Sequence, residues 1–248
     1  METTRKAETR NETNYHGTDL RDVACFRDYA SDETLRAMLR QPTYIRADAE
    51  SRYEGNWAKQ VIAKVTDYSR KHTQELPYHN FNHENDVAEV CDRIAEKLKL
   101  PARERFILHA AGKTHDLIVI LGAKNNEVKT ARRVNDLLIT PEYNVAHTDA
   151  EEIGRTIVQT EVPQKPYTTL GEILCDADLA NFGRTDFFEK SDLVRQELGI
   201  NSGKGWYASC LNLLKNHKYH TQAARDMFDE QKARNIQKLE EMLGRAEC

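Results

Sequence analysis

Residues 78–98 read YHNFNHENDVAEVCDRIAEKL, and this stretch decides the fold class of the chain. Its apolar residues recur every three or four positions, at Val87, Val90, Cys91, Ile94 and Leu98. This spacing places them on one face of an α-helix and leaves the charged residues on the other face. The segment is therefore predicted to be an amphipathic helix that buries one side.

The same helical period continues before and after this segment. Two further apolar stripes consist of Trp57, Val61, Val65 and Tyr68, and of Ala233, Ile236, Leu239 and Leu243. Leu100-Pro101 and Thr140-Pro141 predict helix boundaries, because proline is favoured in the first turn of a helix. A strand-like alternation is present only weakly, over residues 156–162. Together these patterns predict an all-α fold.

Composition and charge place the chain among globular proteins. The 248 residues carry 36 Lys and Arg against 40 Asp and Glu, and 39% of them are apolar. This content is enough to bury a core, and the length fits one or two domains. Residues 1–30 are predicted to be a flexible polar tail, and residues 31–248 a single domain.

Several classes of protein are not expected. The longest apolar run, residues 117–121, is far shorter than the roughly 18–20 residues that span a bilayer, so no membrane segment is expected. The five cysteines include no CxxC pair, and the first residues lack the apolar core of a secretory signal, which favours a cytoplasmic protein with reduced thiols. The slight negative charge makes nucleic acid an unexpected partner, while a homo-oligomer stays open.

Two of the three segments that could carry chemistry are pairs of like residues. His79 and His83 are four residues apart, and on a helix this spacing would stack both imidazoles on one face, with Asp86 one turn further along. Asp176 and Asp178 lie between apolar residues. Each pair taken alone has an ordinary structural explanation, such as a surface position or a helix cap.

The third segment is His115-Asp116. It lies within an apolar stretch, residues 106–120, that is expected to be one helix. A carboxylate buried there would be costly unless a cation compensated its charge, and a metal ion is a common compensator. The three segments together supply imidazoles and carboxylates, a mixed nitrogen and oxygen set suited to a divalent transition metal.

The order of these segments resembles the HD-domain superfamily of metal-dependent phosphohydrolases. In one branch, the predicted metal-dependent HD phosphohydrolases, a YHN-x-x-H segment precedes HD, N-E and D-A-D-L segments. This chain has YHN at 78–80 with His83, then HD at 115–116, NE at 126–127 and DADL at 176–179. The resemblance covers roughly residues 35–245 and implies a helical bundle with a metal site among its central helices.

The resemblance implies a ligand set. His83, His115 and Asp116 would bind the metal, and the fourth ligand would be Asp176 or Asp178. These two point about 200° apart on a helix, so only one can face the metal. Superfamily motifs in which the last ligand directly precedes a leucine favour Asp178. Asp176 would then cap the helix or support the site from outside the ligand set.

The resemblance implies a catalytic acid, and the position and charge of other residues suggest a base and phosphate contacts. His79 matches the histidine with which phosphodiesterases protonate the leaving oxygen, and Glu127 would orient water or act as a base. Lys113, Lys124 and Arg155 are the candidates for contact with phosphate.

Asp86, one turn after His83, would support the ligands from outside the ligand set. The cofactor would be a divalent ion, with Mn, Mg, Fe, Co, Ni and Zn all open.

The expected activity is hydrolysis of a phosphate ester or anhydride of a nucleotide-type substrate by a metal-activated water. Two alternatives stay open. One is a cyclic-nucleotide phosphodiesterase, because the YHN-x-x-H-x-x-D-V stretch resembles the opening signature of that class. The other is a metal- and nucleotide-binding sensor without turnover, because Gly112-Lys113-Thr114 replaces the aromatic or aliphatic residues that usually precede HD.

Overall fold

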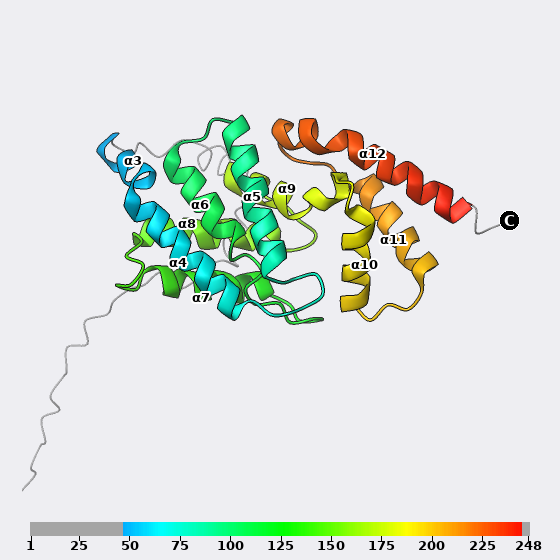
Figure 1. The fold of residues 1–248 in the computed structure, drawn as a ribbon, viewed down its shortest axis with the longest axis horizontal. Helices are drawn as coiled ribbons and strands as arrows, with labels where there is room; N and C mark the ends of the chain where they lie inside the picture. The colour runs from blue at the N-terminus through cyan, green and yellow to red at the C-terminus, as the bar shows by residue number, and fades with distance from the viewer. Residues whose placement is uncertain (1–46, 245–248) are drawn as a thin grey trace, which may run out of the picture.

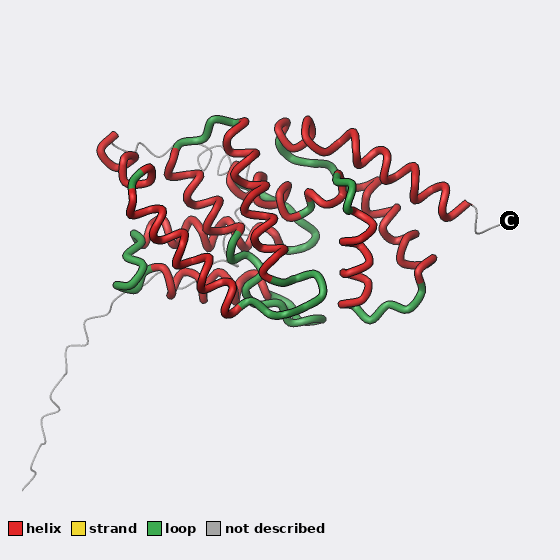
Figure 2. The backbone as a smooth tube through the Cα atoms, viewed as in Figure 1, coloured by secondary structure: helices red, strands yellow, loops and turns green. Residues whose placement is uncertain are grey.

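The computed structural model describes residues 47–244, and all regular structure in this range is helical (Figures 1 and 2). The predicted all-α class is confirmed. The helices are α3 (Ala47–Glu54), α4 (Asn56–His72), α5 (Phe81–Lys97), α6 (Ala102–Gly112), α7 (Asn126–Leu138), α8 (His147–Ile157), η2 (Val158–Thr160), α9 (Thr169–Asp178), η3 (Ala180–Gly183), α10 (Phe187–Glu197), α11 (Gly203–Asn216) and α12 (Gln222–Gly244). The predicted tail over residues 1–30 and the first part of the predicted domain lie outside the described residues.

The apolar stripes that predicted helices lie on α4, α5 and α12. Helix α5 begins at Phe81 because the Asn80 side chain caps it: its Oδ1 accepts hydrogen bonds from the backbone N–H groups of Asn82 at 2.9 Å and His83 at 3.3 Å. His79 therefore precedes the helix. The expected stacking of His79 and His83 on one helical face does not occur.

The apolar stretch around His115-Asp116 is not one helix, contrary to expectation. Helix α6 ends at Gly112, and the HD pair lies in the turn that follows. Helices α5 and α6 approach so closely here that a Cβ on Gly112 would lie 2.7 Å from the Cα of Ala88. This close approach requires glycine and brings the turn against α5.

One further expectation, a helix start at residues 140–141, was wrong. No helix starts at Thr140-Pro141, where residues 140–143 form a turn, and α8 begins instead at His147. The weakly strand-like residues 156–162 lie at the end of α8, in η2 and in the start of the loop that follows. The Thr156 hydroxyl donates to the carbonyl of Glu152 one turn back in α8, at 2.8 Å.

The helices form two regions, which we call the bundle (residues 47–178) and the C-terminal unit (residues 187–244) (Figure 1). In the bundle, α5, α6 and α9 pack against one another, and α4, α7 and α8 surround them. Its core is a large cluster of mainly aliphatic side chains. In the C-terminal unit α11 packs along α12, and η3 connects this unit to the end of α9. None of the described helices combines the length and the apolar character needed to cross a membrane.

Candidate metal centre

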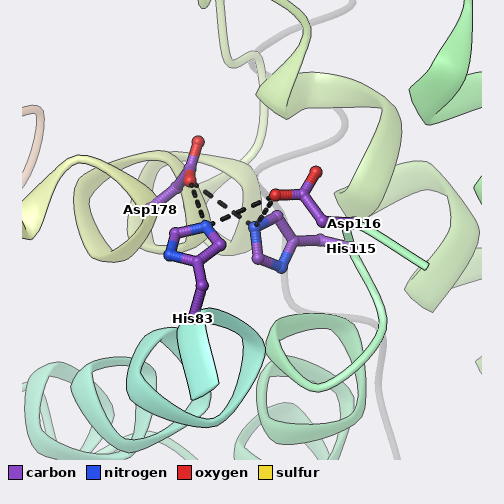
Figure 3. Close-up of side chains that lie close together, drawn as sticks. All are labelled: His83, His115, Asp116 and Asp178. Carbon is purple, nitrogen blue, oxygen red and sulfur yellow. Dashed lines mark ion pairs between the residues drawn. The ribbon is translucent and has the colours of Figure 1, made fainter. Parts of the chain in front are cut away.

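Four side chains from three parts of the bundle meet at one point (Figure 3). His83 comes from the first turn of α5, His115 and Asp116 come from the turn after α6, and Asp178 is the last residue of α9. One nitrogen or oxygen atom from each lies within 4.8 Å of the others. The structure thus brings together the four residues that the resemblance implied as ligands.

The distances within this cluster match those between ligands of a single ion. His83 Nε2 lies 3.3 Å from Asp116 Oδ2 and 3.3 Å from Asp178 Oδ1. His115 Nε2 lies 3.2 Å and 3.5 Å from the same two atoms. Nitrogen and oxygen ligands that are bound to one metal at about 2.0–2.2 Å are themselves about 3–3.5 Å apart.

Both histidines present an unpartnered nitrogen to this point. Their Nε2 atoms are buried and make no hydrogen bond. The other ring nitrogen of His115, Nδ1, lies 3.0 Å from the carbonyl oxygen of Gly112, which can only accept, so Nδ1 carries a proton and Nε2 is the nitrogen that could bind an ion. Two buried imidazole nitrogens beside two carboxylates form a donor set that a divalent transition metal satisfies, and these residues therefore fit the implied ion.

The electrostatics of the cluster keep its carboxylates ionised. Burial opposes the charge of both aspartates, but the imidazoles of His83 and His115 in their protonated form outweigh it, through their charge and their hydrogen bonds. They lower the pKa of Asp178 to about 2 and hold the pKa of Asp116 well below its usual value. Two negative charges thus face the point where the four side chains converge.

Asp176 faces away from this cluster, toward the C-terminal unit. Its carboxylate accepts hydrogen bonds from the backbone N–H groups of His220 at 2.7 Å and Thr221 at 2.8 Å, and from the Thr221 hydroxyl at 2.7 Å. These bonds tie the end of α9 to the two residues directly before α12. The choice of Asp178 over Asp176 therefore agrees with the geometry, because side chains two residues apart on a helix point in nearly opposite directions.

His79 lies beside the cluster, with its Nε2 4.0 Å from Asp116 Oδ2. A buried carboxylate, Glu197 at the end of α10, holds this imidazole: its Oε1 lies 2.5 Å from Nδ1. The other oxygen, Oε2, accepts from the backbone N–H groups of Tyr78 at 2.9 Å and of His79 at 3.0 Å. Because the carboxylate accepts the Nδ1 proton, the Nε2 atom is directed toward the cluster.

Sequence reasoning assigned no role to Glu197. It is separated from His79 by 118 positions, and nothing near it in the sequence indicates this contact. A buried glutamate would have indicated a special role, but the burial of Glu197 results from the docking of α10 against the loop before α5 and is not visible in the sequence.

Asp86, the predicted supporting residue, pairs with Arg184 in the segment before α10. The two oxygens of Asp86 lie 2.6 and 2.7 Å from Nη1 of Arg184, and Nη2 of the same guanidinium lies 2.8 Å from Asp186. This pairing connects α5 to the segment that leads into α10. Whether it supports the metal ligands stays a prediction.

The predicted phosphate contacts engage other partners. The Lys113 amine donates to Asn85, which is two residues after His83 on α5 and thus on nearly the opposite side of that helix. Arg155 pairs with Glu152 within α8, at 2.9 Å. Lys124 is exposed in the loop before α7.

Glu127, the predicted base, is half-buried in the first turn of α7. Between residues 47 and 244, no hydrogen bond or ion pair joins it to His83, His115, Asp116 or Asp178. Its role stays a prediction.

Comparisons with known proteins support the fold. No model of a known protein family matches the chain, and no curated protein sequence matches it. Among the solved structures that match is the crystal structure of Bacillus subtilis YpgQ in complex with ADP, with a TM-score of 0.58 and 19% sequence identity. The match covers 75% of this chain and 95% of the YpgQ chain. The described chain therefore shares the fold of YpgQ.

Proposed function

We propose that the protein is a metal-dependent phosphohydrolase of the HD-domain superfamily that cleaves a phosphate ester or anhydride of a nucleotide-type substrate. One observation carries the proposal: two buried, unpartnered imidazole nitrogens converge with two carboxylates. The order of these residues along an all-α chain supports the same assignment. The ADP in the YpgQ crystal structure supports a nucleotide as the substrate class.

The chain's part in catalysis begins with holding the ion. His83 and His115 would supply neutral nitrogen ligands, and Asp116 and Asp178 would supply one carboxylate oxygen each. A divalent ion bound there would polarise the phosphoryl group and lower the pKa of a water to near neutrality. Because the ligands come from three parts of one packed core, their positions are fixed before substrate arrives.

His79 would act as the general acid. With Nδ1–H directed to Glu197, a second proton on Nε2 would lie on the side of the imidazole that faces the cluster. The 4.0 Å separation from Asp116 exceeds hydrogen-bond length, so this proton remains available for a leaving oxygen. Proton transfer from a positioned side chain typically raises a reaction rate by roughly 10²–10⁴-fold.

A second candidate function is binding of a metal and a nucleotide without turnover. It is favoured by the placement of Lys113 and Arg155, which were expected to contact phosphate and instead pair with Asn85 and Glu152. A sensor needs no cation that stabilises the charge developing on the transferred phosphoryl group.

The test is product release by metal-stripped protein resupplied with Mn²⁺, Mg²⁺, Co²⁺ or Zn²⁺. The substrates are nucleoside di- and triphosphates, cyclic nucleotides and simple monoesters, with products separated by chromatography. We expect metal-dependent turnover that is lost in Asp116→Ala and retained in Asp67→Ala, which removes an exposed carboxylate on α4. A 5′-monophosphate formed from a cyclic substrate would identify a phosphodiesterase.

Absence of product from the wild-type protein with metal bound would contradict the hydrolase assignment for these substrates. A nucleotide-dependent rise in melting temperature without product would then favour the second candidate, because a ligand that binds only the native state stabilises it by mass action.

A further inference from the structure

The two carboxylate oxygens of Asp178 have different partners. Oδ1 faces the Nε2 atoms of His83 and His115, at 3.3 and 3.5 Å. Oδ2 accepts a hydrogen bond of 2.8 Å from the side-chain amide of Gln164, in the loop between η2 and α9. We infer that Gln164 is a positioning residue of the metal centre, which holds Asp178 so that Oδ1 alone is presented to the ion. This inference rests on the proposed function.

Asp178 has particular need of such a partner. It is the last residue of α9, and the C-terminal end of a helix carries a partial negative charge that disfavours a carboxylate. Its side chain retains some exposure to solvent, at 16%. Without a donor on Oδ2, the carboxylate could rotate and exchange its two oxygens. The Gln164 N–H group removes this freedom and offsets part of the unfavourable helix charge.

The loop that carries Gln164 is fixed at its base. The side chain of Gln159, in η2, closes the loop: its Oε1 accepts from the backbone N–H groups of Tyr167 at 2.8 Å and Thr168 at 3.1 Å, and its Nε2 donates to the carbonyl of Arg155 at 2.9 Å. Gly171 leaves the space for this side chain, since a Cβ there would lie 2.0 Å from Oε1 of Gln159.

Two prolines further restrict the loop around Gln164. Pro163 precedes it directly and Pro166 follows two residues later, and each fixes its own backbone φ angle. Gln164 therefore reaches Asp178 from a constrained segment, so that little backbone freedom is lost when the hydrogen bond forms. A neutral amide in this position orients Asp178 without adding charge to the cluster.

The test compares two substitutions of adjacent residues. Gln164→Met keeps the side-chain length and removes the donor, whereas Lys165→Met changes an exposed neighbour on the same loop. Affinities for Mn²⁺ and Co²⁺ are measured by competition with a chelating dye, the visible absorption of the Co²⁺ form is recorded, and the melting temperature is measured without metal. All three measurements are made on the full chain.

We expect Gln164→Met to bind both ions about 10–100-fold more weakly and to alter the Co²⁺ spectrum, with the metal-free melting temperature unchanged. Lys165→Met should match the wild type in all three measurements. Wild-type affinity and spectrum in Gln164→Met would overturn the inference and leave the proposed function standing. Equal losses in both variants would assign the effect to the loop as a whole and also overturn it. Failure of the wild-type protein to bind either ion would overturn both proposals.

Discussion

The bundle and the C-terminal unit contribute to the candidate site in different ways. The bundle has the larger core and supplies all four candidate metal ligands. The C-terminal unit has a smaller core, to which Phe187, Leu214 and Leu239 belong, and supplies none of the four. It contributes Glu197, which holds His79, and its last helix is tied to the bundle by Asp176. The geometry of the four candidate ligands therefore depends on the core of the bundle alone. The position of His79, the proposed acid, depends on the junction between the bundle and the C-terminal unit.

The two aspartates at the end of α9 allow the sharpest test of this division, with the largest expected effects. Asp178→Asn removes the charge of a candidate ligand, so metal affinity should fall by more than the roughly 10–100-fold that is typical of a supporting contact. Asp176→Asn should leave metal affinity near that of the wild type and lower the free energy of unfolding by about 1–3 kcal/mol, because an amide cannot accept all three hydrogen bonds from His220 and Thr221.

Mn²⁺ titration and urea unfolding of both variants measure these two effects. If Asp176→Asn lost more metal affinity than Asp178→Asn, Asp176 would be the ligand and Asp178 the structural tie. The bundle would then not supply the ligands in the way described.

Glu197→Gln tests the contribution of the C-terminal unit. An amide N–H group facing Nδ1 of His79 would favour the other tautomer, so the rate constant kcat should fall by about 10–100-fold, which is part of the usual contribution of a general acid. Metal affinity should be unchanged, because Glu197 touches none of the four ligands. The pH profile of kcat should also change shape.

Steady-state kinetics with the substrate identified in the product assay provide this measurement. Glu189→Gln, an exposed position on the same helix, is the matched control. Loss of metal binding in Glu197→Gln would mean that the two regions are not separable.

The smallest expected effect is on the pH dependence of stability. Burial raises the pKa of Glu197, but the hydrogen bonds from His79 outweigh burial and hold the pKa below the usual 4.5. The unfolded state therefore binds this proton more readily than the native state, and the stabilisation is present above about pH 4.5 and lost as the pH falls through the lowered native value.

Urea unfolding of the wild type and Glu197→Gln with a chelator present, at pH 7 and at pH 3.5, should show a free-energy difference that shrinks at the lower pH. A difference that stays constant over this interval would contradict the linkage.

Features that depend on local periodicity were predicted from the sequence, whereas features that depend on packing were not. Helices α4 and α5 were predictable, because one buried face leaves a periodic apolar stripe in the sequence. Helix α12 was also predicted from such a stripe, although only Leu239 of its four residues is buried and Ala233 is exposed. The end of α6 at Gly112 was not, because the apolar residues continue past it and only the close approach to Ala88 explains the glycine. The placement of His79 before α5 was also missed, although Asn80 is a favourable cap residue and offered a local signal.

The four residues of the cluster could be named from their types and order, together with the resemblance these carry. Gln164 and Glu197 could not be identified in this way. Gln164 acts through one hydrogen bond across a loop, and Glu197 through three to residues more than a hundred positions away. Gln and Glu are common surface residues, and neither residue type by itself indicates such contacts. Lys113, a predicted phosphate contact, shows that closeness in the sequence does not ensure closeness in space. It lies two positions from His115 and yet reaches the far side of α5.

The sequence by itself determined the all-α class, the main helices and the residue types that could hold a metal. These properties are local: periodicity and donor chemistry are written in short segments. Only the tertiary structure decided which donors converge, which of the two aspartates on α9 faces them, and which side chains fix His79 and Asp178. Those outcomes depend on how α5, α6 and α9 pack and on where the C-terminal unit docks, and packing joins residues that are distant in the chain.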